Sequence, residues 1–387
     1  MQKPFAGDHS LLKSINLTSL LDLIRRKAPI SRAELAKSTR LTRATVSTLV
    51  EELIARHLVV ETGTGESSGG RRPTMLEINR NAGYIAGVDL RAKDLLVLAV
   101  NLQGEPVLKR TEEYERPQDE EHTRKQLTAL IGEIRNELPL SPLGLCGVGV
   151  GIHGFVGHPG GEILFVPHFG WKRLAWKEAL EKEWRVPVWI DNEANLAALG
   201  ELESGAAADC SDMLYVSVGA GIGGGLILDR NIFRGSHGYA GEIGHTTIER
   251  GGRLCTCGNR GCWEMYASEK ALAESLGLRY KPGVTAEVTR RLQEGDAEAR
   301  EAIRDIGGSL AVGIGNLINT FNPQMVVLGN AIAFYRSWLE EVMASSMRSR
   351  FPFRSGEAVE IRYSELGEEA CARGAAFMGI REMMKRV

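Results

Sequence analysis

The pattern of apolar and polar positions predicts two consecutive helices near the start of the chain. Ser31 followed by Glu34 is the signature of a capping box, so a short helix is expected to begin there and to end before Leu41. A second helix is expected to start at once, with Thr42 as its cap. Its apolar residues recur at intervals of three and four, which predicts one buried stripe. The stripe consists of Val46, Leu49, Val50, Leu53 and Ile54.

The opposite face of the second helix indicates contact with DNA. Small, polar and cationic side chains gather at its N-terminal end, the end that a recognition helix presents to bases and phosphates. They are Arg43, Thr45, Ser47 and Thr48. Two strand-like runs follow, at 58–62 and 74–78, and the Gly/Ser-rich loop between them ends in Arg71 and Arg72. This order predicts a winged head whose loop arginines contact phosphates or a narrow minor groove. The alternative is a three-helix protein-interaction module with a solvated loop.

The segment resembles the winged helix-turn-helix heads of bacterial repressors, with two departures. Arg40 stands in the turn between the helices and His57 at the helix end, where such heads usually have glycine. Each departure either places a non-glycine residue in an unusual backbone conformation or changes the type of turn.

From Tyr84 onwards the pattern predicts an α/β body. Strands are expected at 84–90, 95–102, 106–114, 146–152 and 186–191, with a helix at 119–137. A second group of strands starts at Met213 and is followed by long helices. The body is therefore expected to form two α/β lobes, and ligand sites favour the cleft between such lobes.

Composition and charge place the chain among globular proteins with a basic front. Its 387 residues suffice for two or three domains, and its 43% hydrophobic and 25% charged residues are ordinary. No apolar run approaches the roughly 18 residues of a membrane-spanning helix, and the first ten residues lack a signal peptide's apolar stretch, so a cytoplasmic location is expected. Residues 1–75 contain 12 Lys or Arg against 7 Asp or Glu, whereas the remainder is acidic. A basic head on an acidic body suits binding of nucleic acid.

Three of the six cysteines lie within eight positions and indicate a metal site. With His245, the residues Cys255, Cys257 and Cys262 supply the four ligands of a closed, structural zinc site, one per chain. Because all four positions are filled, a catalytic water is not expected. The alternatives are reduced cysteines without a ligand and an iron–sulfur cluster, which usually requires four cysteines.

The strings GEIGHTTIERGGRLCTCGNRGCWEMYASE and DNEANLAALGE resemble the ROK family of repressors, open reading frames and sugar kinases, over nearly the whole chain. The head resembles the repressor branch, and the cysteine motif is most similar to that of xylose repressors. The family implies an actin-like, two-lobed sugar-kinase fold, a structural zinc and a monosaccharide in the cleft. The expected domains are a head at 1–80, lobe I at 81–191 completed by 369–387, and lobe II at 192–368.

The resemblance also implies the sugar contacts. They fall on Asn192, Glu193, Glu242, His245 and Glu264. His245 would then bind zinc through one ring nitrogen and face a sugar hydroxyl with the other. His168 occupies a position where relatives often have an asparagine that contacts the sugar, which leaves the identity of the sugar open.

The sequence departs from the kinases of the family at each phosphate-binding turn. The first turn keeps Asp89 but has Arg91, Ala92 and Lys93 in place of Gly-Gly-Thr, so side chains occupy the space that a phosphate needs. Ala220 replaces a threonine in the second turn, and Asn330 with Ala331 replaces two glycines in the adenosine-side turn. The general base, usually aspartate, is Glu193, whose extra methylene displaces the carboxylate by about 1 Å. No catalytic residue is therefore expected.

Together these patterns predict a sugar-responsive transcriptional repressor without kinase activity. It is expected to bind a palindromic operator as a homodimer or a dimer of dimers and to sense a monosaccharide, with xylose and glucose as the first candidates. The competing hypotheses are an ATP-dependent sugar kinase that retains a DNA-binding head, and a zinc-sensing regulator, which a closed metal site disfavours.

Overall fold

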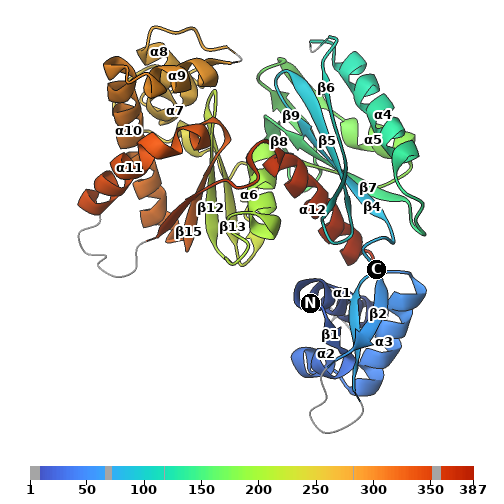
Figure 1. Ribbon diagram of the computed structural model, residues 1–387. Helices are drawn as coiled ribbons and strands as arrows, with labels where there is room; N and C mark the ends of the chain where they lie inside the picture. Colours follow the sequence, from blue (N-terminus) through green and yellow to red (C-terminus); the bar gives the residue numbers. More distant parts are fainter. Residues whose placement is uncertain (1–8, 66–71, 117, 282, 351–358) are drawn as a thin grey trace, which may run out of the picture. The chain divides into compact units, whose positions relative to one another are not determined.

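A computed structural model describes residues 9–65, 72–116, 118–281, 283–350 and 359–387 (Figure 1). The chain divides into two compact units. The first unit comprises Met1–Val150, Trp176–Trp189 and Ala375–Val387, and the second comprises Gly151–Ala175 and Ile190–Gly374. Within the described residues, no helix is both long enough and apolar enough to cross a membrane.

The first unit begins with a small head built from three helices and a three-stranded sheet (Figure 1). Its elements are α1 (His9–Lys27), β1 (Ile30–Ser31), α2 (Arg32–Thr39), α3 (Arg43–Ala55), β2 (Val59–Thr64) and β3 (Thr74–Ile78). The strands are ordered β1-β3-β2, and β2 pairs antiparallel with β3 as the hairpin of a winged head requires. Leucines of α1, α2 and α3 fill its core.

Local signals account for the helices of the head. Ser31 and Glu34 form the predicted capping box, and the Thr42 hydroxyl accepts a hydrogen bond from the backbone N–H of Thr45 at 3.1 Å. The predicted stripe of α3 is buried, except that Ile54 is half-buried. Arg40 and His57 adopt φ angles of 59° and 62°, so both residues take the left-handed conformation that glycine usually supplies.

The remainder of the first unit is a twisted sheet covered by helices on both faces. Its strands are β4 (Tyr84–Leu90), β5 (Asp94–Asn101), β6 (Pro106–Glu113), β7 (Leu145–Ile152) and β11 (Val188–Asn192), in the order β11-β7-β4-β5-β6. The helices α4 (Glu120–Glu137) and α5 (Trp176–Trp184) lie on one face, and α12 (Ala370–Lys385) lies on the other (Figure 1). Close contact with α12 requires glycine in the sheet, since a Cβ on Gly149 would lie 2.0 Å from the carbonyl oxygen of Ala375.

The second unit is built on a five-stranded sheet in the order β14-β13-β12-β15-β16. Its strands are β12 (Met213–Val218), β13 (Ile222–Leu228), β14 (Asn231–Ile232), β15 (Met325–Gly329) and β16 (Glu360–Tyr363). β12 pairs antiparallel with β13 and parallel with β15. A small antiparallel sheet precedes it, formed by β8 (Phe155–Val156), β9 (Ile163–Val166) and β10 (Trp171–Leu174).

Helices cover both faces of this five-stranded sheet (Figure 1). α6 (Glu193–Ser204) packs on one face, where a Cβ on Gly225 would lie 2.4 Å from the carbonyl oxygen of Ala194. The other face carries the large apolar core of the unit, which includes buried side chains from α10. The remaining helices are α7 (Glu264–Ala267), α8 (Glu269–Ser275), α9 (Val284–Gln293), α10 (Ala297–Phe321) and α11 (Arg336–Arg350).

Candidate functional site

A pocket of about 480 Å³ lies within the second unit, a size typical of small-molecule sites. Its lining residues come from several separate segments of the chain. They include the loop before β8, the start of α6 and the turn between β12 and β13. The segment before α7, the start of α8 and the residue after β15 contribute as well. All five predicted sugar residues line it, namely Asn192, Glu193, Glu242, His245 and Glu264. His168 lines it as well. Every lining residue belongs to the second unit, so the cleft between the lobes stays a prediction.

Three carboxylates give the pocket its acidic character. Glu193 is the first residue of α6, where the helix dipole favours a negative charge. Burial raises the pKa of Glu242, the nearby His245 opposes this shift, and the negative charges of Glu193 and Glu264 add to it. The three acids therefore lie close enough to interact and offer several hydrogen-bond acceptors to one ligand.

Asn192 has a structural role in addition to lining the pocket. Its side-chain oxygen caps α6 by accepting hydrogen bonds from the backbone N–H groups of Ala194 and Asn195, at 2.8 and 3.3 Å. Its amide nitrogen donates to the carbonyl oxygen of Gly154 at 2.9 Å. One N–H of the amide is left for a ligand.

His245 faces two different groups with its two ring nitrogens. Nδ1 lies 3.6 Å from Cys255 Sγ and 3.5 Å from a carboxylate oxygen of Glu264. Nε2 lies on the side of Glu242, 4.0 Å from its carboxylate. The ring thus connects the cysteine cluster with the acidic wall of the pocket.

The four predicted metal ligands form a cluster that could hold a metal ion. The ligand atoms of His245, Cys255, Cys257 and Cys262 all lie within 4.8 Å of one another. The sulfurs of Cys257 and Cys262 are 3.7 Å apart. Burial raises the pKa of Cys255, helped by the hydrogen bond of its thiol to Glu264, to about 12. A backbone hydrogen bond involving Asn259 lowers the pKa of Cys257.

Glycines and one tryptophan shape the cysteine loop. Gly258 and Gly261 have φ angles of 91° and 80°, and a Cβ on Gly261 would lie 1.8 Å from the carbonyl oxygen of Glu249. Directly after the loop, the buried Trp263 packs against Gly313 of α10 and donates from its indole nitrogen to the carbonyl oxygen of Ser309 at 2.9 Å. The core of the second unit therefore anchors the segment that carries Glu264.

The first altered phosphate turn lies in the first unit, between β4 and β5, and its residues bond to one another. The backbone N–H of Arg91 donates to the carbonyl oxygen of Asp94 at 3.1 Å, and Arg91 Nε donates to the Asp94 carboxylate at 2.6 Å. Tyr114 donates to the carbonyl oxygen of Arg91 at 2.8 Å. The guanidinium of Arg91 thus lies against an acid of its own turn.

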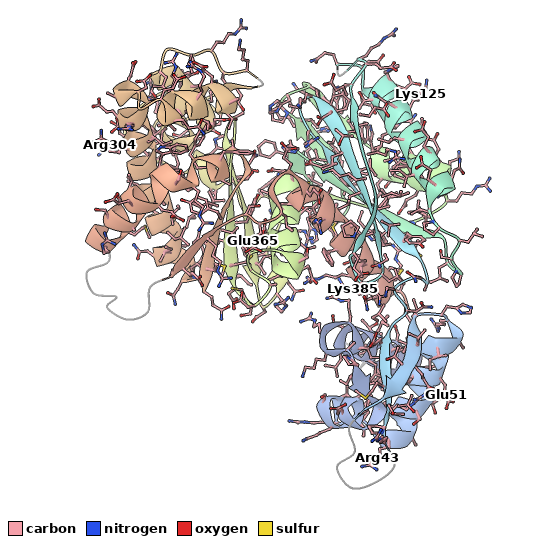
Figure 2. All side chains as sticks on the ribbon, viewed as in Figure 1. Arg43, Glu51, Lys125, Arg304, Glu365 and Lys385 are labelled. Carbon is pink, nitrogen blue, oxygen red and sulfur yellow. The ribbon has the colours of Figure 1, made fainter. Side chains whose placement is uncertain are left out.

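The predicted DNA contacts lie at the expected end of α3. Arg43 and Thr48 are exposed, Thr45 and Ser47 are half-buried, and Figure 2 shows the Arg43 side chain at the surface of the head. The Thr45 hydroxyl lies 2.8 Å from the Thr42 hydroxyl, so it takes part in the cap. In the wing, Arg72 is exposed, whereas Arg71 lies outside the described residues.

The pocket includes residues that the sequence pattern alone did not single out. They are His153, Phe155, Ser217 and Lys270. Two of them could have been selected from the sequence. His153 directly follows the buried strand β7, and Ser217 is a polar residue in the apolar strand β12, just before a Gly-rich turn. Partial desolvation and the proximity of His153 lower the pKa of His168. A neutral imidazole there presents one donor and one acceptor.

Comparison with known proteins decides the family. The sequence profile of the ROK family matches residues 85–382. The chain belongs to the ROK family. It is 37% identical to the xylose repressor of Bacillus subtilis strain 168 over 381 residues, covering 98% of this chain and 99% of that protein. It is 35% identical to the xylose repressor of Caldicellulosiruptor bescii, covering 98% of both chains.

Solved structures of ROK proteins share the fold. A ROK family transcriptional regulator, described as a homologue of the E. coli MLC protein, matches with a TM-score of 0.82 at 27% identity and 97% coverage of both chains. A ROK glucokinase from Streptomyces griseus, solved with glucose and AMPPNP, matches with a TM-score of 0.65 at 25% identity. It covers 76% of this chain and 99% of its own. The predicted fold of a winged head followed by a two-lobed sugar-kinase body is therefore confirmed.

Proposed function

We propose that this ROK protein is a sugar-responsive transcriptional repressor that binds operator DNA through residues 1–80 and a monosaccharide in the pocket of the second unit. The observation that carries the proposal is the pairing of a winged head with an acid- and imidazole-lined pocket in one chain. Xylose repressors match the chain over nearly its whole length, and xylose is therefore the first sugar to test, followed by glucose.

The chemistry of the pocket suits a polyhydroxylated ligand. Each sugar hydroxyl both donates and accepts, so it is best bound by a group of carboxylates, amides and imidazoles. Glu193, Glu242 and Glu264 accept hydrogen bonds from hydroxyl groups, and His245 Nε2 faces the same side as Glu242. The remaining N–H of Asn192 donates to a hydroxyl oxygen.

The cysteine cluster fits a structural zinc ion. In tetrahedral zinc, bonds of about 2.3 Å to sulfur and 2.0 Å to nitrogen place two sulfurs about 3.8 Å apart and a sulfur and a nitrogen about 3.5 Å apart. The corresponding separations are 3.7 Å between Cys257 and Cys262 and 3.6 Å between Cys255 and His245 Nδ1. A bound zinc would hold the loop together and orient the imidazole, with no coordination position left for a reacting water.

The residues of the phosphate turns argue against phosphoryl transfer. Arg91 is bonded to Asp94 in the turn where a kinase has glycines, and the Asn330 side chain lies against Gly219 of the second turn. The carboxylate at the position of the general base, Glu193, accepts a hydrogen bond from Ser217. The repressor senses the sugar without phosphorylating it.

On DNA, α3 contacts base edges through Arg43, Thr45, Ser47 and Thr48, while Arg71 and Arg72 contact the backbone or the minor groove. Two heads of a homodimer, or of a dimer of dimers, occupy the half-sites of a palindromic operator. The chain thus has operator DNA, a monosaccharide and a second copy of itself as partners, and zinc as its cofactor.

A panel of pentoses and hexoses tests the proposal by thermal shift. A sugar that binds only the native state raises the melting temperature of the full-length protein. We expect at least one monosaccharide, with xylose tested first, to raise it in a concentration-dependent manner and to release the protein from operator DNA in a gel-shift assay. Turnover of ATP with any of these sugars, at the roughly 1–100 per second of ordinary kinases, would instead support the sugar kinase.

A further inference from the structure

We propose that Asn330 is a positioning residue of the sugar pocket, which orients the carboxylate of Glu193 through the hydroxyl of Ser217. Asn330 occupies the adenosine-side turn where the kinases of the family have glycine. In this chain the substitution has therefore given the sugar site a new support in addition to removing a nucleotide contact. The inference rests on the proposed sugar binding.

The hydrogen bonds that join the three residues have defined directions. Ser217 Oγ donates to Glu193 Oε1 at 2.6 Å, because an ionised carboxylate can only accept. Asn330 Nδ2 donates to the same Ser217 oxygen at 3.3 Å. The hydroxyl thus uses its single proton toward Glu193 and a lone pair toward Asn330. Such a chain of donors is polarised in one direction, and each bond strengthens the next.

Neighbouring backbone fixes the orientation of the Asn330 amide. Asn330 Oδ1 accepts a hydrogen bond from the backbone N–H of Ala331 at 2.8 Å, which leaves Nδ2 on the side of Ser217. The backbone of Asn330 is left-handed, with a φ of 66°, a conformation that asparagine tolerates better than most residues.

Strand register brings the two residues together across a long stretch of sequence. In the parallel pairing of β12 with β15, Ser217 is the partner of Gly329. Asn330 directly follows Gly329, so the ladder itself places the amide beside the hydroxyl. Ser217 is only 5% exposed, and its hydrogen bond to Glu193 is partly buried at the wall of the pocket.

The glycines of the turn between β12 and β13 make room for this arrangement. A Cβ on Gly219 would lie 3.1 Å from Asn330 Nδ2, and a Cβ on Gly221 would lie 2.7 Å from a carboxylate oxygen of Glu264. Neither glycine has a positive φ, so conformation alone does not require them. Both leave space for side chains that line the sugar pocket.

The hydrogen bonds of Ser217 and Asn330 are expected to increase the affinity for sugar. With Ser217 and Asn330 in place, Glu193 is held in one orientation before the sugar arrives, so less ordering is required on binding. Removal of the amide donor leaves the Ser217 hydroxyl held by Glu193 alone, so the two side chains can change orientation together. Since one hydrogen bond is worth about 1 kcal/mol, we expect a loss of affinity of roughly fivefold.

The test compares two asparagines that share a backbone conformation. Asn322, the exposed C-cap of α10, is also left-handed, with a φ of 45°, and it does not line the pocket. Asn330→Gly and Asn322→Gly therefore make the same change in backbone preference, and only the first removes the donor. Asn330→Asp retains an acceptor for Ala331 but cannot donate to Ser217. Affinity of the zinc-loaded, full-length protein for xylose and glucose is measured by calorimetry, and melting temperature reports folding.

We expect Asn330→Gly and Asn330→Asp to weaken sugar binding about fivefold, with Asn322→Gly unchanged. Ser217→Ala should weaken it as well, Ser217→Thr should retain it because the hydroxyl is kept, and the double variant Asn330→Gly/Ser217→Ala should lose no more than Ser217→Ala alone. Wild-type affinity in both Asn330 variants, or fully additive losses in the double variant, would overturn the inference while sugar binding itself stands. If the wild-type chain binds no monosaccharide, the proposed function fails and the inference fails with it.

Discussion

His245 belongs both to the cysteine cluster and to the lining of the pocket. Its Nδ1 faces Cys255 and its Nε2 faces Glu242, so one imidazole can bind a metal and a ligand at the same time. A carboxylate oxygen of Glu264 lies 3.0 Å from Cys255 Sγ, so a second pocket residue adjoins the cluster. Metal binding and sugar binding are therefore expected to depend on each other.

Loss of one cysteine thiolate should impair both zinc binding and sugar binding. We expect Cys257→Ser to abolish stoichiometric zinc, measured by elemental analysis as one ion per chain in the wild type, and to lower both the melting temperature and the sugar affinity, because the loop leads into Glu264. Cys146→Ser in the first unit, outside the cluster, is the matched control and should change none of these. Full sugar binding by a protein without zinc would refute the account of this site.

Substitution of the acids in the pocket should abolish the response to the sugar and leave DNA binding intact. Glu242→Ala and Glu264→Ala each remove a hydrogen-bond acceptor from the pocket and leave the head unchanged. We expect both variants to bind operator DNA like the wild type in a gel-shift assay, while addition of the sugar no longer releases them. Variants that lose operator binding in the absence of sugar would contradict this division of roles.

At the scale of single elements, we expect α3 and the wing to carry the contacts with DNA. The cap of α3 involves Thr42 and Thr45, so Thr45 has two roles and Ser47 is the cleaner probe of base recognition. We expect Ser47→Ala to change the preferred operator sequence in a binding-site selection experiment, with little effect on affinity for unrelated DNA.

The arginines of the wing should affect binding to DNA of any sequence, whereas Ser47 should affect sequence preference. Replacing Arg71 and Arg72 with alanine is expected to weaken binding to all sequences and to reduce the slope of log affinity against log salt by about one per lost phosphate contact. Arg304→Ala on α10, an exposed arginine of the second unit that Figure 2 labels, is the control and should leave the slope unchanged. An unchanged slope in the wing variant would remove these arginines from the DNA interface.

The phosphate turns give a prediction about catalysis. Restoring Gly-Gly-Thr at 91–93 should not produce sugar-dependent ATP hydrolysis, because Asn330 still lies against Gly219 and Glu193 still holds the position of the base. A coupled assay, with the Streptomyces griseus ROK glucokinase as positive control, checks this. Turnover by the restored variant would show that the first turn alone had silenced the kinase.

Elements with local signals were predictable from the sequence, and contacts between distant segments were not. Ser31 with Glu34 and Thr42 mark helix starts through bonds made within one turn, so α2 and α3 begin where expected. The strands of the small sheet β8-β9-β10 have two to four residues, too few for a visible alternation, and they were missed. The bond between Ser217 and Asn330 spans 113 positions and depends on the pairing of β12 with β15, which no local pattern reveals. The sugar residues and the metal ligands were found by family resemblance and cysteine spacing, and their roles stay predictions.

At the scale of the whole molecule, the two ends of α12 contact different elements. Its start contacts α6, and residues at and after its end contact the head. Near its start, Gly374 packs against α6, where a Cβ would lie 1.6 Å from the carbonyl oxygen of Leu196. Near its end, the carbonyl oxygen of Met384 accepts a hydrogen bond from Thr18 at 3.4 Å, and that of Val387 accepts one from Arg56 at 2.7 Å. α6 itself begins at Glu193. Coupling between the pocket and the head is therefore to be established by measuring both affinities, and not from these contacts.

The sugar and the operator are expected to influence each other's binding through one protein. Half-sites one helical turn apart, about 34 Å, tolerate little change in the separation of two heads, so a sugar that favours a different arrangement weakens DNA binding. By linkage, the operator must weaken sugar binding by the same factor.

Titration of xylose, or of whichever monosaccharide binds most tightly, with and without saturating operator DNA measures this factor directly. We expect weaker sugar binding in the presence of operator, and an equal loss of operator affinity when the sugar is saturating. Tighter sugar binding on the operator would make the ligand a corepressor and reverse the sign of the switch. Identical sugar affinities in the two titrations, for every sugar that binds, would show that the sugar and the operator do not influence each other.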